Sequence, residues 1–184
     1  MKKLLMSLAV AAMAITVNAQ VYLGGTVGLA SVGHENGSDV TTFKILPEIG
    51  YNLNKSWAIG TVVGYQKGTF SMMDQTIANM DGFKGFTIAP YARYTFLHSK
   101  VVNMFIDLGF NYTAGEVDDV DVDVVGIGLH PGIAINLNQH FAVVGKIGFF
   151  GYENINPEGD NNNTHAFGLD LNGNNISLGL YYNF

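Results

Sequence analysis

The sequence predicts an all-β fold: an eight-stranded antiparallel up-and-down transmembrane β-barrel. Three observations predict it: an alternation of apolar residues with small or polar ones, an alternation of short and long connections, and a low content of charge. Charged residues make up 13 % of the chain, whereas an average soluble domain carries roughly 25 %. Together with 23 glycines among 184 residues, this composition favours a β-rich protein with an apolar outer surface.

The first residues have the features of an export signal. Two lysines precede an apolar stretch that ends at Val17, and Ala19 ends a suitable cleavage site. A membrane anchor or a buried helix is the alternative, but the apolar stretch is shorter than the about 20 residues of a spanning helix. We therefore expect a signal peptide over residues 1–19, cleaved on export, and a single barrel domain over residues 20–184.

Eight segments of this domain alternate with the period of a β-strand, whose successive side chains point to opposite faces. Each is close to the length of a membrane-spanning strand, about 9–11 residues, or slightly longer. The segments are residues 21–30, 42–53, 57–68, 84–96, 101–113, 124–137, 141–152 and 176–184.

The connections between these segments alternate in length. Three are short: residues 54–56, 97–100 and 138–140. The intervening loops are longer and acidic: residues 33–41, 69–83, 114–123 and 153–174. Short turns at one end and long loops at the other are typical of a transmembrane barrel.

The apolar face of each segment is expected to point outward, toward lipid. A soluble eight-stranded barrel also alternates, but its interior has room only for side chains or one small ligand. Packing the Trp, Phe, Ile and Leu residues of every segment inside would overfill it, whereas the Gly-, Ala-, Thr- and Asn-rich face suits a narrow lumen. In lipid the barrel has to be closed, because an open sheet edge would leave backbone groups unpaired.

The final segment has an irregular pattern. Upstream of Ile176 the apolar residues Phe167, Leu169 and Leu171 occupy odd positions, whereas the tail places its apolar residues at even positions. A β-bulge or a separate hairpin in the last loop would explain this change of phase.

The inward face carries a set of charged and titratable side chains. Because an unpaired ion away from water costs several kcal/mol, we expect Arg93 to pair with Asp107 or Glu48, and the lysines to share the remaining acid or water. The predicted lumen network is Lys44, Glu48, Arg93, Asp107, His130 and Lys146. It is interpreted as a polar plug, with a gated ion path or a catalytic role as alternatives.

The sequence offers little sign of metal or cofactor chemistry. The chain has no cysteine, which excludes thiolate sites. In the acidic segment 114–123, Asp119, Asp121 and Asp123 are a weak calcium candidate, since calcium takes several carboxylate oxygens. However, the EF-hand spacing is not met, and a solvated acidic loop is the simpler interpretation. We expect no cofactor and no metal.

Catalysis and nucleic-acid binding are not favoured either. Two groups at the predicted rim, Ser31 with His34 and Asp39, and His165 with Asp170, match no known catalytic motif. Without residues 1–19, seven basic residues remain against fifteen acidic ones, a net charge of −8 in place of −6. This balance argues against nucleic acid as a partner, since its footprint is a basic patch.

The eight alternating segments, the rhythm of turns and loops, and the stretches PYARYTF and ISLGLYYNF resemble small outer-membrane barrels of the OmpA/OmpX type, with their porin-like β-barrel domain. The resemblance implies an integral protein of the Gram-negative outer membrane with a structural or surface-recognition role and no enzymatic activity. A narrow channel or small-ligand carrier is the alternative, and a lipid-modifying enzyme is a more remote one.

The resemblance also implies partners. These are outer-membrane lipid, periplasmic chaperones during export, and the barrel insertion machinery. The terminal aromatics Tyr182 and Phe184 resemble the insertion signal that this machinery reads, although they could serve only as residues of an interfacial aromatic girdle.

Overall fold

In a computed structural model of the chain, the structure describes residues 20–32, 40–67, 83–117, 120–157, 164–170 and 176–184. The predicted signal, residues 1–19, lies outside this part. The strands are β1 (Val21–Val32), β2 (Val40–Asn52), β3 (Trp57–Lys67), β4 (Lys84–Leu97), β5 (Val102–Val117), β6 (Val120–Asn136), β7 (Phe141–Ile147), β8 (Phe149–Pro157), β9 (Thr164–Asp170) and β10 (Ile176–Asn183). No helix within the described ranges is long and apolar enough to cross a membrane.

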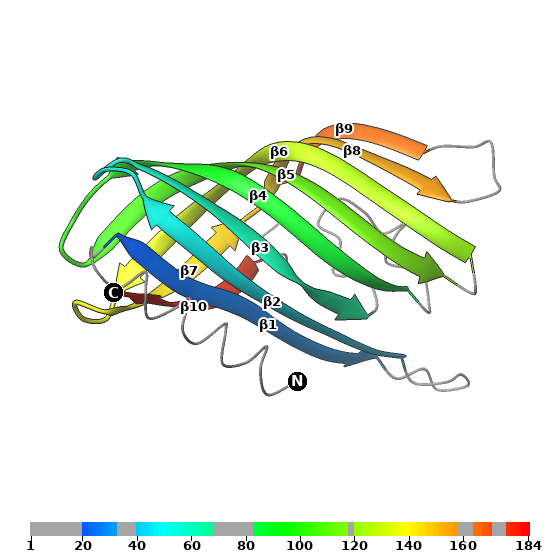
Figure 1. Cartoon of the computed structure of the whole chain (residues 1–184), viewed down its shortest axis with the longest axis horizontal. Coiled ribbons are helices and arrows are strands. Elements are labelled where there is room, and N and C mark those ends of the chain that lie inside the picture. The colour runs from blue at the N-terminus through cyan, green and yellow to red at the C-terminus, as the bar shows by residue number, and fades with distance from the viewer. Residues whose placement is uncertain (1–19, 33–39, 68–82, 118–119, 158–163, 171–175) are drawn as a thin grey trace, which may run out of the picture.

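Eight of these strands form a closed antiparallel ring. Strands β1 to β7 pair in chain order, and β10 pairs with β7 on one side and β1 on the other. The ring is confirmed as the predicted up-and-down barrel, drawn in Figure 1 from β1 in blue to β10 in red. Its closing contact joins β1 to β10 from Tyr22 to Thr26, opposite Asn183 to Gly179.

The short connections lie at one end of the barrel, here called the short-turn end, together with the C-terminus (Figure 1). Two of these turns are held by the same pattern of side-chain-to-backbone hydrogen bonds. The side-chain oxygen of Asn54 accepts hydrogen bonds from the backbone N–H groups of Ser56 and Trp57, and Asn138 does the same for His140 and Phe141. An Asn that bonds its own backbone in this way favours a tight turn. The opposite end is called the loop end.

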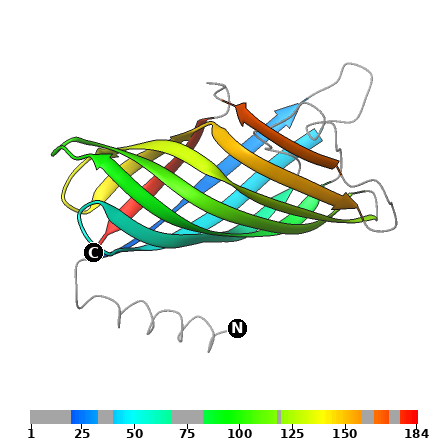
Figure 2. The same ribbon diagram turned by 90° about the horizontal axis from the view of Figure 1, so that it is seen from above.

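The predicted seventh segment is broken into β7 and β8 at Gly148, which has a φ of 72°. A left-handed residue changes the phase of the alternation, and this corrects one prediction. In the predicted segment 141–152 the alternation puts Phe141, Val143, Ile147 and Phe149 on the outward apolar face. In the structure, however, Phe149 is buried and Phe150 is exposed instead. Strand β8 then pairs with the loop-end part of β6, and β9 pairs with β8. A separate hairpin, β8–β9, therefore precedes the last strand. It continues the wall beyond β7, as Figure 2 shows in orange.

The predicted loop 114–123 is also wrong in part, because most of it is strand. Strand β5 continues to Val117 and β6 begins at Val120, with Gly115 opposite Val122 and Glu116 opposite Asp121. The physical reason lies in the alternation itself: valines at every second position suit a strand, and the acidic residues between them face outward.

The two faces of the barrel differ strongly in exposure. Side chains of the apolar rows face outward, with exposed fractions of 54 % for Ile45, 55 % for Phe86 and 51 % for Leu108. The interior holds Tyr22 and Phe105, which are 3 % and 2 % exposed.

Candidate functional site

A cluster of aromatic side chains fills the interior nearest the short-turn end. Tyr22 stacks on Tyr181 with ring centroids 5.4 Å apart, and its hydroxyl lies 2.6 Å from that of Tyr91. These three rings and Phe105 are buried together. The alternation places all four on the inner face, but from different strands, so that only the closed ring brings them into contact.

Glycines make room for these rings. A Cβ added to Gly50 would overlap the ring of Tyr22, and one added to Gly132 would overlap the ring of Phe105. Large inward side chains therefore fit only because the facing positions carry no side chain, as expected for an interior packed to the density of a protein core.

Arg93 lies at the centre of the charged cluster. Strands β4 and β5 place it directly opposite Asp107. Its Nε donates to Asp107 Oδ1 at 2.7 Å and its Nη2 donates to Oδ2 at 2.9 Å. This two-bond arrangement is the strong, directional form of an Arg–carboxylate pair.

Two further charges complete the cluster from across the lumen. Arg93 Nη2 lies 3.3 Å from Glu48 Oε1, and Lys146 Nζ lies 3.2 Å from both Glu48 Oε2 and Asp107 Oδ2. The four side chains come from β2, β4, β5 and β7 and carry two positive and two negative formal charges. Mutual neutralisation with several hydrogen bonds is what makes buried ions tolerable.

The aromatic and charged groups form one unit. The guanidinium of Arg93 lies 3.9 Å from the ring centroid of Phe105, within the range of a cation–π contact. The hydroxyl of Tyr91 donates to Glu48, and the Tyr181 hydroxyl lies 3.4 Å from Arg93 Nη2. We call this unit, made of Glu48, Arg93, Asp107, Lys146, Tyr22, Tyr91, Phe105 and Tyr181, the plug cluster.

The remaining two residues of the predicted network, His130 and Lys44, are not members of the plug cluster. His130 is opposite Asp107 in register and packs against Phe149, with ring centroids 5.0 Å apart. Lys44 lies four residues farther toward the loop end than Glu48, opposite Gly28 and Gln66. The alternation in the sequence puts the aromatic members of the plug cluster on the inner face, but it did not predict that they pack around Arg93; the facing glycines were a usable signal.

The predicted insertion signal lies where the ring closes. The backbone N–H of Phe184 donates to the Val21 carbonyl at 3.1 Å. The Tyr182 ring contacts the rings of Phe141 and Phe184, with centroids 5.1 Å and 4.9 Å apart. Recognition of these residues by an insertion machinery stays a prediction.

At the loop end, charge moves to the outer face. Adjacent strands β3 to β6 carry Lys67, Lys84, Glu116 and Asp121 in one row across the wall. Lys84 Nζ lies 3.0 Å from Glu116 Oε1, with both side chains about half exposed. On the same strand β6, Val122 faces inward and is buried. The alternation is thus reversed at this end, as expected where the surrounding medium changes from hydrocarbon to water and head groups.

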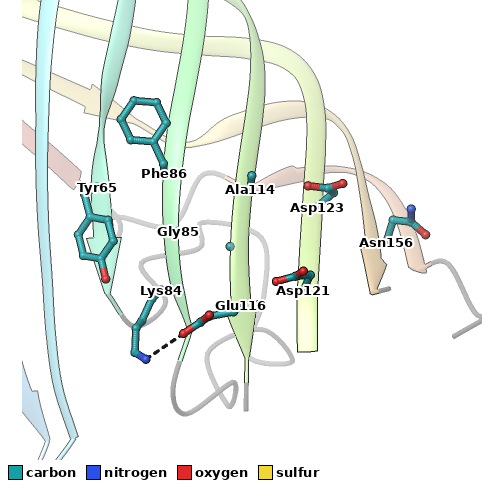
Figure 3. Close-up of a pocket in the computed structure, with 10 residues that line it drawn as sticks. Tyr65, Lys84, Gly85, Phe86, Ala114, Glu116, Asp121, Asp123 and Asn156 are labelled. Carbon is teal, nitrogen blue, oxygen red and sulfur yellow. Dashed lines mark hydrogen bonds and ion pairs between the residues drawn. The ribbon is translucent and has the colours of Figure 1, made fainter. Parts of the chain in front are cut away.

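The outer face has a hollow next to this charged row, on its short-turn side. Figure 3 shows its lining residues, which come from β3, β4, β5, β6 and β8. Its volume is about 820 Å³. The aromatic rings of Tyr65 and Phe86 lie on one side, and Asp123 and Asn156 on the other, with Ala114 between them.

The metal and catalytic candidates lack support from this geometry. Within the part of the chain that the structure describes, no three His, Cys, Asp or Glu side chains gather closely enough to hold a metal ion. Asp119, like His34 and Asp39, lies outside the described residues, while Asp121 and Asp123 face outward on β6. Asp123 accepts a hydrogen bond of 2.8 Å from Tyr112, and His165 stacks against Tyr152.

Comparisons with known proteins agree with this architecture. The sequence model of the outer membrane protein beta-barrel domain matches residues 3–184. Among solved structures, the crystal structure of Neisserial surface protein A (NspA) is similar, with a TM-score of 0.51 and 16 % sequence identity. That similarity covers 89 % of this chain and 97 % of the other, and it shows a shared fold. Among curated proteins, none matches the chain by sequence.

Proposed function

The chain belongs to the outer membrane protein beta-barrel domain family, and we propose that it is a non-conducting, non-catalytic barrel with a structural or surface-recognition role. Integral outer-membrane barrels have short periplasmic turns and longer extracellular loops. In this proposal the short-turn end therefore faces the periplasm, and the loop end faces the cell exterior.

The plug cluster is the observation that carries this proposal. Four ionic side chains and four aromatic rings occupy the interior near the short-turn end. Arg93, Asp107 and Glu48 are each less than 10 % exposed. An ion crossing the barrel would have to displace several charge-assisted hydrogen bonds, so a permanent pore is not expected. The closed interior argues against the channel alternative.

Planar-bilayer recordings of the refolded protein test the sealed interior. We expect no unitary conductance from the wild-type barrel. The double variant R93A/D107A removes one positive and one negative charge together, and we expect it to conduct. A defined conductance in the wild-type protein that this double variant leaves unchanged would refute the seal.

Complementation separates the structural role from surface recognition. A strain that lacks the protein would be scored for sensitivity to detergent, and then supplied with the wild type or with E116Q/D121N/D123N. Full rescue by this variant favours a structural role, because the substitutions leave the plug cluster and the apolar rows unaltered. Loss of rescue, with normal amounts of folded barrel, favours recognition through the acidic rim. Both roles would be contradicted if the strain that lacks the protein showed normal detergent sensitivity and its cells bound other cells and surfaces as the wild type does.

A further inference from the structure

The outward hollow at the loop end has a lining that suits a sugar. Its walls offer two partly exposed aromatic rings, Tyr65 and Phe86, 40 % and 55 % exposed. Aromatic faces pack against the C–H faces of apolar or amphipathic ligands, and the exposed ring of Tyr65 also carries a hydroxyl. The hollow exists because the residue between the rings and the polar side is Ala114, whose side chain is small.

The opposite side of the hollow supplies hydrogen-bonding groups of both kinds. Asp123 lies next to Ala114 in register, and Asn156 lies next to Asp123. A carboxylate accepts hydrogen bonds from hydroxyl groups, while an amide side chain both donates and accepts. At the edge nearest the loop end, Asp121 and Glu116 add hydrogen-bond acceptors, and the Lys84 ammonium adds a donor group. A ring bearing several hydroxyls would match this mixture.

The position of the hollow points to the source of that sugar. On the short-turn side of the hollow, the neighbouring row of residues is Val63, Ile88, Tyr112 and Val125. On its loop side lies the charged row that contains Lys84 and Glu116. Rows on one face are two residues apart, roughly 6–7 Å along the strand. The hollow thus lies at the boundary between the apolar band and the charged rim. It faces outward, so that the neighbouring groups in a membrane are lipid head groups.

We infer that the hollow lined by Tyr65, Phe86, Ala114, Asp121, Asp123 and Asn156 is a docking site for the sugar head group of an outer-leaflet glycolipid. The sugar ring packs against Phe86 and Tyr65. Its hydroxyls donate to Asp123 and Asp121 and share hydrogen bonds with Asn156. The acyl chains lie along the neighbouring apolar rows, on the short-turn side of the hollow. This inference rests on the orientation given in the proposed function, with the loop end at the cell exterior, but it does not depend on whether the lumen is sealed.

Binding can be measured by native mass spectrometry of the refolded barrel in detergent. The probe is lipid A, a glycolipid, and the control lipid is phosphatidylglycerol, which is anionic and has no sugar ring. We expect F86A and D123N each to lower the affinity for lipid A at least tenfold, with no change for phosphatidylglycerol. Phe96, outward-facing and 48 % exposed at the short-turn end of β4, lies at the far end of the wall from the hollow and supplies the matched variant F96A, which should bind both lipids like the wild type.

A blocking variant tests the shape of the hollow while keeping all of its polar groups. We expect A114L to fill the floor and to lose lipid A binding, while its heat-modifiable migration stays that of a folded barrel. Equal binding of lipid A by wild type, F86A, D123N and A114L would overturn the inference, as would an equal loss for the two lipids. Preferential binding of free glucosamine disaccharide over lipid A would overturn the assignment to a membrane glycolipid.

Discussion

Strands β4 and β5 carry two ion pairs in corresponding positions, one near each end of the barrel, and their surroundings are opposite. Arg93 and Asp107 face inward near the short-turn end, with side chains 9 % and 2 % exposed. Lys84 and Glu116 face outward at the loop end, with side chains 49 % and 45 % exposed. The same cross-strand arrangement therefore serves two purposes: it holds the interior together at one end and marks the edge of the apolar band at the other.

The difference shows how the distribution of apolar and charged side chains over the two faces of the wall follows the medium around it. Near the short-turn end the apolar side chains are outside and the charges inside. At the loop end of β6 the acidic Asp121 and Asp123 are outside, and Val122 is inside and buried. Because the strand period is two, this inversion needs only a change in which of two successive positions is apolar.

The largest effect is expected where the ring closes at the short-turn end. Deletion of Phe184 removes the last backbone bond to Val21 and the terminal aromatic, and we expect a severalfold loss of assembled, heat-modifiable barrel in cells. F96A provides the control, since Phe96 is an exposed aromatic residue at the same end of the barrel. If both changes reduced assembly equally, Phe184 would be only a girdle residue and not part of an insertion signal.

The second prediction concerns the inner ion pair. R93A leaves two buried carboxylates facing one lysine, so that the free energy of unfolding should fall by about 3–5 kcal/mol. The measurement is urea unfolding of the barrel in lipid vesicles. The outer pair is the comparison: K84A breaks an exposed pair and should cost at most about 1 kcal/mol. Similar losses for the two variants would contradict the contrast between the two ends.

A third test concerns the packing of the plug cluster. G50A places a methyl group against the Tyr22 ring and should lower the free energy of unfolding by about 1–3 kcal/mol, the usual cost of overpacking. G109A is the matched control, because the nearest atom to a Cβ there is 3.7 Å away, an ordinary contact. An unchanged urea midpoint in G50A would show that the Tyr22 ring moves aside without cost.

The smallest effect is expected at the junction between β7 and β8. In G148A an alanine has to adopt a positive φ, which costs roughly 1–2 kcal/mol. The substitution should also speed amide exchange in β8, measured by hydrogen–deuterium exchange, because it disturbs the phase change. G145A, on β7, has only ordinary contacts at 3.6 Å and should leave exchange in β8 unaltered. Faster exchange in G145A than in G148A would argue against Gly148 as the source of the break.

The sequence by itself determined the barrel, the outward direction of its apolar rows and the ends of most strands. It could do so because these features follow from local alternation and from turn residues such as Asn54. Arg93 and Asp107 could likewise be paired, since neighbouring strands joined by a short turn have a nearly fixed register.

Only the tertiary structure decided which distant groups meet. Glu48 and Lys146 are 98 positions apart, and their contact depends on closure and on the width of the lumen, neither of which is encoded in a local pattern. The phase change at Gly148 depends on one backbone angle, which glycine permits but does not require. The hollow at the rim arises because five strands place residues of different size in one row, so it exists only once their registers are set.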